Sequence, residues 1–151
     1  MPGAASLSAA RYYAHPRNRF WPLMQRVCGV DAGLDYPQRI RALQAAGVGL
    51  WDVIGQCERT GSLDAAIVPD SEIANPLAAR LASLAELRAI AFNGGKAAQA
   101  FARHVAPGWR NEARIDVSLH VLPSTSPANA AFSLDALYAQ WRVLEDALRR
   151  P

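Results

Sequence analysis

Cysteine and lysine are scarce in this sequence, and long apolar runs are absent. The two cysteines, Cys28 and Cys57, are too few for a disulfide framework, a four-cysteine zinc site or a four-thiolate iron–sulfur cluster. Charged residues interrupt every apolar stretch before the roughly 18 consecutive residues that a membrane-spanning helix needs. The N-terminus has no apolar secretory core. We therefore expect a cytoplasmic protein without a structural metal or a membrane segment.

The rest of the composition is that of an ordinary globular protein. Of the 151 residues, 51% are hydrophobic and 19% are charged, and the mean hydropathy is -0.02. These values exclude a disordered or collagen-like chain. At about 100–200 residues per domain, the length leaves no room for a second domain of normal size. We expect one domain that covers residues 1–151.

The positive charge is carried almost entirely by arginine. The net charge is +3 and the pI is about 9.2, which permits an anionic partner without requiring one. Of the 16 basic residues, only Lys96 is a lysine. The planar arginine fork suits phosphate, but a genomic composition bias explains this usage equally well.

Three apolar, strand-like runs alternate with helical patterns. The runs cover residues 47–54, 87–92 and 115–122, and Pro123 ends the third because proline cannot continue a ladder. Helical patterns cover residues 20–28, 37–46, 76–84, 96–105 and 134–149, the last with Ser133 as its N-cap. This alternation predicts an α/β fold of three layers, α/β/α, with a central parallel sheet covered on both faces.

In such a sheet, ligands bind at the carboxyl ends of the strands. Two turns with residues suited to binding a ligand follow the second and third runs. Asn93-Gly94-Gly95-Lys96 offers backbone N–H groups to an anion, or is simply a strand-to-helix turn, since the outer glycines of a P-loop are absent. The segment 123–129, with Ser124, Thr125 and Ser126, is either an anion nest or a capped turn.

The segment 12–21 packs aromatics, a histidine, an amide and two arginines into ten residues. A site for a nucleobase needs a flat face for stacking, an amide and phosphate contacts. Tyr13 offers the face, Asn18 the amide, and Arg17 and Arg19 the contacts. The alternative is structural, with Asn18 capping the helix that follows it and the aromatics in the core.

Asp52 follows Trp51 inside the first apolar run. A buried carboxylate must be paired, hydrogen-bonded or functional, because an isolated buried charge is too expensive. Both a structural and a functional role stay open for Asp52. His104 and His120 have no partners at ligand spacing, so we expect no metal site.

Four blocks of the sequence form a recognisable set. They are residues 1–7, 12–21, 50–64 (Leu-Trp-Asp-Val, Cys-Glu-Arg and Gly-Ser-Leu-Asp), and 92–96 with 122–128. Together these blocks resemble the uracil-DNA glycosylase superfamily, most closely its DNA-deoxyinosine (hypoxanthine-DNA) glycosylase branch. They span nearly the whole chain in the family's order, and the Tyr-Tyr-Ala-His-Pro-Arg-Asn and Leu-Pro-Ser-Thr-Ser-Pro stretches are the specific ones.

The resemblance implies an enzyme that flips a deaminated base, hypoxanthine or else xanthine or uracil, out of DNA and hydrolyses its N-glycosidic bond. It implies a monofunctional enzyme that starts base excision repair with no metal or cofactor and acts on single- or double-stranded DNA. Separately, we expect a monomer. Asn18 resembles the residue that positions the catalytic water. Base contacts carry over to Tyr13, His15, Asp52 and Asn93. DNA contacts carry over to Gly3, Arg17, Lys96, Ser124, Thr125, Ser126, Ala128 and Asn129.

Three departures from the family pattern bear on mechanism. Uracil-removing relatives have histidine where this chain has Leu122, so we do not expect strong uracil activity. Met1 stands where other branches carry a catalytic Asp or Asn, which moves the water-positioning role to Asn18. The apolar strand that precedes the first motif in relatives is missing, and we expect roughly ten N-terminal residues to be absent and the chain to be poorly soluble.

Two other hypotheses compete with the enzyme. One is a catalytically silent module that binds a nucleic acid or a nucleotide in the same pocket. The other is an inactive remnant of a glycosylase that has lost its first strand. Release of a base from damaged DNA separates the enzyme from both.

Overall fold

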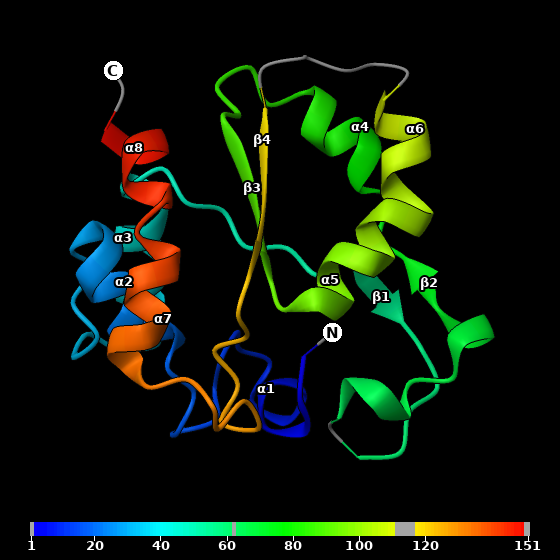
Figure 1. The fold of residues 1–151 in the computed structure, drawn as a ribbon, viewed down its shortest axis with the longest axis horizontal. Coiled ribbons are helices and arrows are strands. Elements are labelled where there is room, and N and C mark those ends of the chain that lie inside the picture. The colour runs from blue at the N-terminus through cyan, green and yellow to red at the C-terminus, as the bar shows by residue number, and fades with distance from the viewer. Residues whose placement is uncertain (1, 62, 111–116, 150–151) are drawn as a thin grey trace. The chain divides into compact units, whose positions relative to one another are not determined.

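The computed structural model describes residues 2–61, 63–110 and 117–149, in which helices and strands alternate (Figure 1). The chain divides into two compact units. We call the described residues up to Ala4 and from Asp52 to Leu122 the sheet unit, and those from Ala5 to Trp51 and from Pro123 onward the helical unit. Each unit is described by itself below.

The sheet unit is built on two parallel strands, β3 (Ala89–Asn93) and β4 (Ser118–Leu122). Their register pairs Ala89 with Ser118 and Asn93 with Leu122, so the carboxyl ends of both strands lie side by side. Just beyond this end, the backbone N–H of Gly94 donates to the carbonyl of Leu122 at 2.9 Å. The α/β class, the parallel pairing and the second predicted strand are therefore confirmed. The third is confirmed over Ser118–Leu122, and residues 115 and 116 of that prediction lie outside the described residues.

The prediction of a buried strand over residues 47–54 is wrong. Only Ile54 of this run is in a strand, β1 (Ile54–Gln56), which pairs antiparallel with β2 (Ile73–Ala74) and not with the parallel sheet. Gly47 and Val48 close the preceding helix instead, since their N–H groups donate to the carbonyls of Gln44 and Leu43. Trp51 is 54% exposed. Apolar residues without a neighbouring strand cannot form a ladder, so the described residues hold a parallel pair in place of a three-stranded sheet.

Helices cover the parallel pair and enclose the core of the sheet unit. These are α4 (Leu77–Ala82), α5 (Gly95–Ala100) and α6 (Ala106–Arg110), with a π-helical turn, η3 (Phe101–Val105), between α5 and α6. Two short 3₁₀ turns, η1 (Asp64–Ala66) and η2 (Pro69–Ser71), lie between β1 and β2. The core consists of Leu77, Phe92, Phe101, Val105, Ala106 and Trp109.

The helical unit consists of five helices: α1 (Ala4–Ala9), α2 (Phe20–Cys28), α3 (Tyr36–Ala45), α7 (Leu134–Trp141) and α8 (Leu144–Arg149). Local signals set the ends of three of them. Gly29 ends α2 in the left-handed conformation, Asp35 and Gln38 form a capping box at α3, and the Ser133 hydroxyl caps α7 as predicted. The predicted helix 134–149 is broken by a turn at residues 142–143.

The core of the helical unit is aromatic and aliphatic, with Phe20, Trp21, Leu23, Met24, Leu137 and Trp141 buried. Phe20 packs edge-on against both Trp21 and Trp141. Since α2 supplies four of these six side chains, the segment just before α2 is held against a rigid base. Among the described helices, none has the length and apolarity that a membrane span requires.

Candidate functional site

A cleft of about 360 Å³ lies in the helical unit, and residues before α2 and on α3 form its walls. Its volume is within the range of roughly 300–1,000 Å³ that is typical of ligand sites. The cleft brings together three of the predicted site residues, Tyr13, His15 and Asn18. Its other side chains include Arg11, Tyr12, Trp21, Tyr36 and Arg39.

Tyr13 presents a fixed flat surface in this cleft. Its ring stacks on Phe20, with centroids 3.8 Å apart and planes inclined by 19°. Its φ is 54°, a left-handed conformation that is rare for a bulky residue. Such conformations cost of order 1–3 kcal/mol and cluster at ligand sites.

Asn18 contacts the start of α2 and also lines the cleft. Its Oδ1 accepts a hydrogen bond from the N–H of Phe20 at 3.0 Å, which satisfies a free donor at the start of α2. The same side chain lines the cleft. A carboxamide oxygen has a second lone pair and the amide nitrogen has two N–H donors, so the cap leaves capacity to hold a water molecule.

His15 is oriented by its own turn. Its Nδ1 accepts from the backbone N–H of Arg17 at 3.1 Å. In the neutral ring this bond places the proton on Nε2, which leaves Nε2 as a donor. The imidazole, which lines the cleft, therefore has Nε2 as its hydrogen-bond donor.

Two arginines in the cleft wall were not among the predicted site residues. The Cζ of Arg39 lies 4.8 Å from the centroid of the Trp21 ring, and the Cζ of Arg11 lies 5.4 Å from that of Tyr36. Sequence periodicity places both in or near helices but does not show which side chains face one cavity. Arg39 follows Tyr36 by three residues on α3, and this one-turn spacing was the only available signal.

The serine turn after β4 is a series of local hydrogen bonds. Ser124 Oγ accepts from the N–H of Ser126, and Ser126 Oγ accepts from that of Ala128, both at 3.2 Å. Asn129 Nδ2 donates to the carbonyl of Ser124 at 2.9 Å. The structural alternative, a capped turn, therefore describes the local geometry. The half-buried Ser124 and Ser126 hydroxyls keep their protons for an outside acceptor.

Arg19 and Thr125 need correction. The guanidinium of Arg19 donates to the carbonyls of Ser126, Asn129 and Phe132, so it anchors the serine turn instead of meeting phosphate. The Thr125 side chain is fully buried, while its carbonyl accepts from the N–H of Arg19. A buried hydroxyl cannot contact DNA in this conformation, so the predicted DNA contact of Thr125 would have to come from its backbone, and that contact stays a prediction.

Four predicted residues, Gly3, Asp52, Asn93 and Lys96, lie in the sheet unit. Asp52 is half-buried just before β1, outside any strand, and its carbonyl accepts from Asn75 Nδ2 at 2.7 Å. Asn93 is the last residue of β3, and Gly3 precedes α1. The strand position expected for Asp52 is therefore wrong, whereas Asn93 is at the carboxyl edge where it was predicted.

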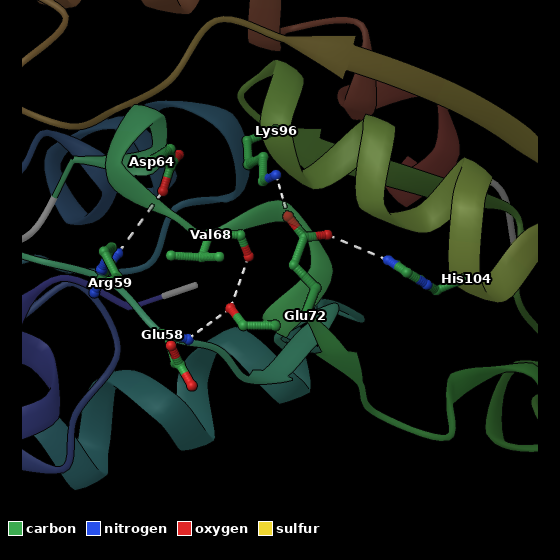
Figure 2. A network of polar contacts seen from close by, with 8 residues as sticks. Glu58, Arg59, Asp64, Val68, Glu72, Lys96 and His104 are labelled. Atoms are coloured by element: carbon green, nitrogen blue, oxygen red, sulfur yellow. Dashed lines mark hydrogen bonds and ion pairs between the residues drawn. The ribbon is translucent and has the colours of Figure 1, made fainter.

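Lys96 is held by a buried carboxylate (Figure 2). Its ammonium pairs with Oε1 of Glu72, whose side chain is 1% exposed, and Oε2 of Glu72 lies 3.2 Å from Nε2 of His104. The hydrogen bond from Lys96 lowers the pKa of Glu72 below its usual value, against desolvation, which raises it. A phosphate would have to compete with Glu72 for this ammonium.

The loop that carries Glu72 is itself fixed by hydrogen bonds (Figure 2). The N–H of Glu58 donates to the Ser71 hydroxyl at 2.8 Å, which donates to the carbonyl of Val68 at 2.7 Å. Nearby, Arg59 lies 3.9 Å from Asp64 and donates to the carbonyl of Pro2. No group of three metal-ligating side chains occurs within residues 2–61, 63–110 and 117–149.

Two curated relatives match this chain. A hypoxanthine DNA glycosylase of Methanosarcina acetivorans is 33% identical over 134 residues, which is 88% of this chain and 78% of that protein. A hypoxanthine DNA glycosylase of Methanosarcina barkeri is 35% identical over 100 residues, which is 66% of this chain and 62% of that protein. The chain thus spans less than two thirds of the second relative.

A solved structure has the same fold. It is a solution NMR structure of a candidate uracil DNA glycosylase from Methanosarcina acetivorans, with a TM-score of 0.77 and 29% identity. The match covers 99% of this chain and 86% of that one. No family model matches the sequence.

Proposed function

The chain belongs to the hypoxanthine DNA glycosylases of the uracil-DNA glycosylase superfamily, and we propose that it removes hypoxanthine from DNA by hydrolysing the N-glycosidic bond. The observation that carries this proposal is the shared cleft of Tyr13 and Asn18. A flat ring and a water-holding amide in one cavity are what an extruded base and its attacking water require.

The chemistry needs no group beyond those in the chain. The base leaves an oxocarbenium-like sugar, so the rate depends on positioning water and stabilising charge. Asn18 holds the water, and Tyr13 stacks on the base. His15, with its donor on Nε2, offers a hydrogen bond to the departing base.

The DNA backbone is held outside the cleft. Ser124, Ser126 and the exposed Arg17 contact phosphates, which offsets the few kcal/mol that unstacking costs. Gly3, Asp52, Asn93, Lys96, Ala128 and Asn129 keep their predicted base or DNA contacts as part of the proposal. The single-domain organisation, the monomeric state and the cytoplasmic location also stay predictions.

Base release from defined duplexes tests the function. Duplexes that contain inosine, xanthine or uracil opposite each normal base are incubated with the protein, and the free base is measured by chromatography. We expect release of hypoxanthine, slower release of uracil, and an intact abasic strand. Salt-sensitive DNA binding without release of any base would contradict the enzyme and select the silent binding module.

A further inference from the structure

Arg39 is a half-buried cation, and none of its guanidinium nitrogens has a hydrogen-bond partner among the described residues. Its guanidinium stacks on Trp21, which is 4% exposed, and the side chain forms part of the cleft wall. Its Nε is buried and has no hydrogen-bond partner among the described residues. A buried donor left unpaired costs free energy, so this arrangement favours a ligand that brings an acceptor.

Arg19 shows what a purely structural arginine looks like in the same unit. Its Nε is also buried without a partner, but its other nitrogens donate to three backbone carbonyls. No carbonyl, carboxylate or hydroxyl within the described residues accepts from Arg39. The guanidinium of Arg39 lies over an aromatic face instead, and the side chain lines the cleft.

Arg11, the other cation in the cleft wall, differs from Arg39 in exposure. Arg11 is exposed to solvent, and its guanidinium lies over the Tyr36 ring. Because water can hydrogen-bond to exposed N–H groups, Arg11 carries no desolvation cost when no ligand is bound. Arg39 is therefore the stronger candidate for a contact that depends on the ligand.

The guanidinium fork fits one class of base. Two neighbouring N–H donors match two neighbouring acceptors, as in the pairing of arginine with O6 and N7 of guanine. Hypoxanthine carries the same O6 and N7 acceptors. Adenine replaces O6 with an amino donor, which an arginine cannot accept.

We propose that Arg39 reads the O6 and N7 edge of the extruded base and so selects 6-oxopurines over adenine. This rests on the proposed function, because the base must enter the cleft. In the reaction the bond between C1′ and N9 breaks and its electron pair goes to the purine. The water oxygen then bonds to C1′, and the water's proton passes to the purine or to solvent. Donors at O6 and N7 stabilise the purine as it gains negative charge. Uracil-removing relatives have a histidine donor for the departing base at the position that Leu122 occupies in this chain.

Binding to uncleavable DNA tests the assignment without relying on catalysis. Duplexes carry 2′-fluoro-deoxyinosine, whose glycosidic bond resists hydrolysis, or its 7-deaza analogue, in which carbon replaces N7. Affinity is measured by fluorescence anisotropy. We expect the wild-type protein to bind the 7-deaza duplex roughly 10- to 100-fold more weakly. Equal affinity for the two duplexes would overturn the proposal, even if no variant folds.

Variants locate the effect. Arg39→Lys and Arg39→Gln should lose the difference between the two duplexes, while Arg41→Lys, an exposed position on the same helix, should keep it. Arg11→Lys should also keep it. The assignment to Arg39 would be overturned if Arg11→Lys lost the affinity difference between the two duplexes. It would also be overturned if both Arg39 variants kept that difference.

The two proposals fail in different ways. If the wild-type protein releases no base from inosine DNA, the glycosylase is wrong, and the anisotropy difference still reports on Arg39. A second outcome is that hypoxanthine is released but the Arg39 variants show the same affinity difference between the two duplexes as the wild type. In that case only the base-reading role of Arg39 is wrong.

Discussion

At the scale of single residues, Asn18 combines a structural and a proposed chemical role in one side chain. Its Oδ1 accepts from the N–H of Phe20, the first residue of α2, and the same side chain lines the cleft. We expect Asn18→Ala to lower the single-turnover rate of hypoxanthine release at least about tenfold, with DNA affinity nearly unchanged. The lost cap should also cost about 1 kcal/mol of stability.

Asn18→Asp separates the two roles. A carboxylate keeps an oxygen for the cap, so this variant should melt close to the wild type while its rate of base release still changes. Both quantities are measured by thermal denaturation and rapid-quench assays. A fall in DNA affinity with unchanged turnover in Asn18→Ala would make Asn18 a binding residue only.

Arg17 and Arg19 are neighbours with opposite expected effects. Arg19→Lys loses the fork that holds three carbonyls and should lower the free energy of unfolding by about 1–3 kcal/mol. Arg17→Ala, at an exposed position, should leave stability unchanged and weaken DNA binding. Urea denaturation and anisotropy measure both variants, and a stability loss in Arg17→Ala would contradict its assignment to phosphate.

At the scale of elements, the contact between Glu72, Lys96 and His104 ties η2 to α5 and η3 in the sheet unit. The pKa of Glu72 is lowered in the folded state, mainly by the hydrogen bond from Lys96. A lowered carboxyl pKa contributes stability above the unfolded value of 4.5, and this contribution is lost as the pH falls through the folded value.

Glu72→Gln should therefore destabilise the protein most above pH 4.5, and the difference from the wild type should shrink as the pH falls below that value. Melting temperatures across this pH range measure it. The control is Glu86→Gln, whose carboxylate is 88% exposed and 3.8 Å from Arg88. A difference that stays constant with pH would show that Glu72 acts through packing alone.

At the scale of the whole molecule, the small net charge limits how strongly DNA binding depends on salt. The proposed cationic contacts are Lys96 and the exposed Arg17, and Lys96 must exchange Glu72 for a phosphate to contribute. Two neutralised phosphates give a slope of about -1.8 in log affinity against log salt, or roughly tenfold weaker binding between 50 and 200 mM. A much steeper slope in an anisotropy titration would mean that other arginines carry the binding.

The sequence predicted those parts of the molecule that local patterns determine. The strands β3 and β4, the cap at Ser133, and Tyr13 and Asn18 as neighbours in one site depend on short stretches of chain. The strand expected over residues 47–54 failed because an apolar run does not show whether a partner strand exists. Arg19 contacts Phe132, 113 residues away, and Arg39 joins the cleft through the packing of α3, so neither role has a local signal.

The capture of Lys96 by Glu72 leaves the molecule almost without a reactive amine. Lys96 is the only lysine in the sequence, and its nitrogen is already occupied. Glycosylases that also nick the strand form an imine between an amine and the opened sugar, and the sequence offers no second lysine for that step. Borohydride added during a reaction on inosine DNA should therefore trap no covalent protein–DNA adduct, as judged by denaturing electrophoresis. A trapped adduct that disappears in Lys96→Met would reveal a strand-nicking enzyme with a mobile lysine.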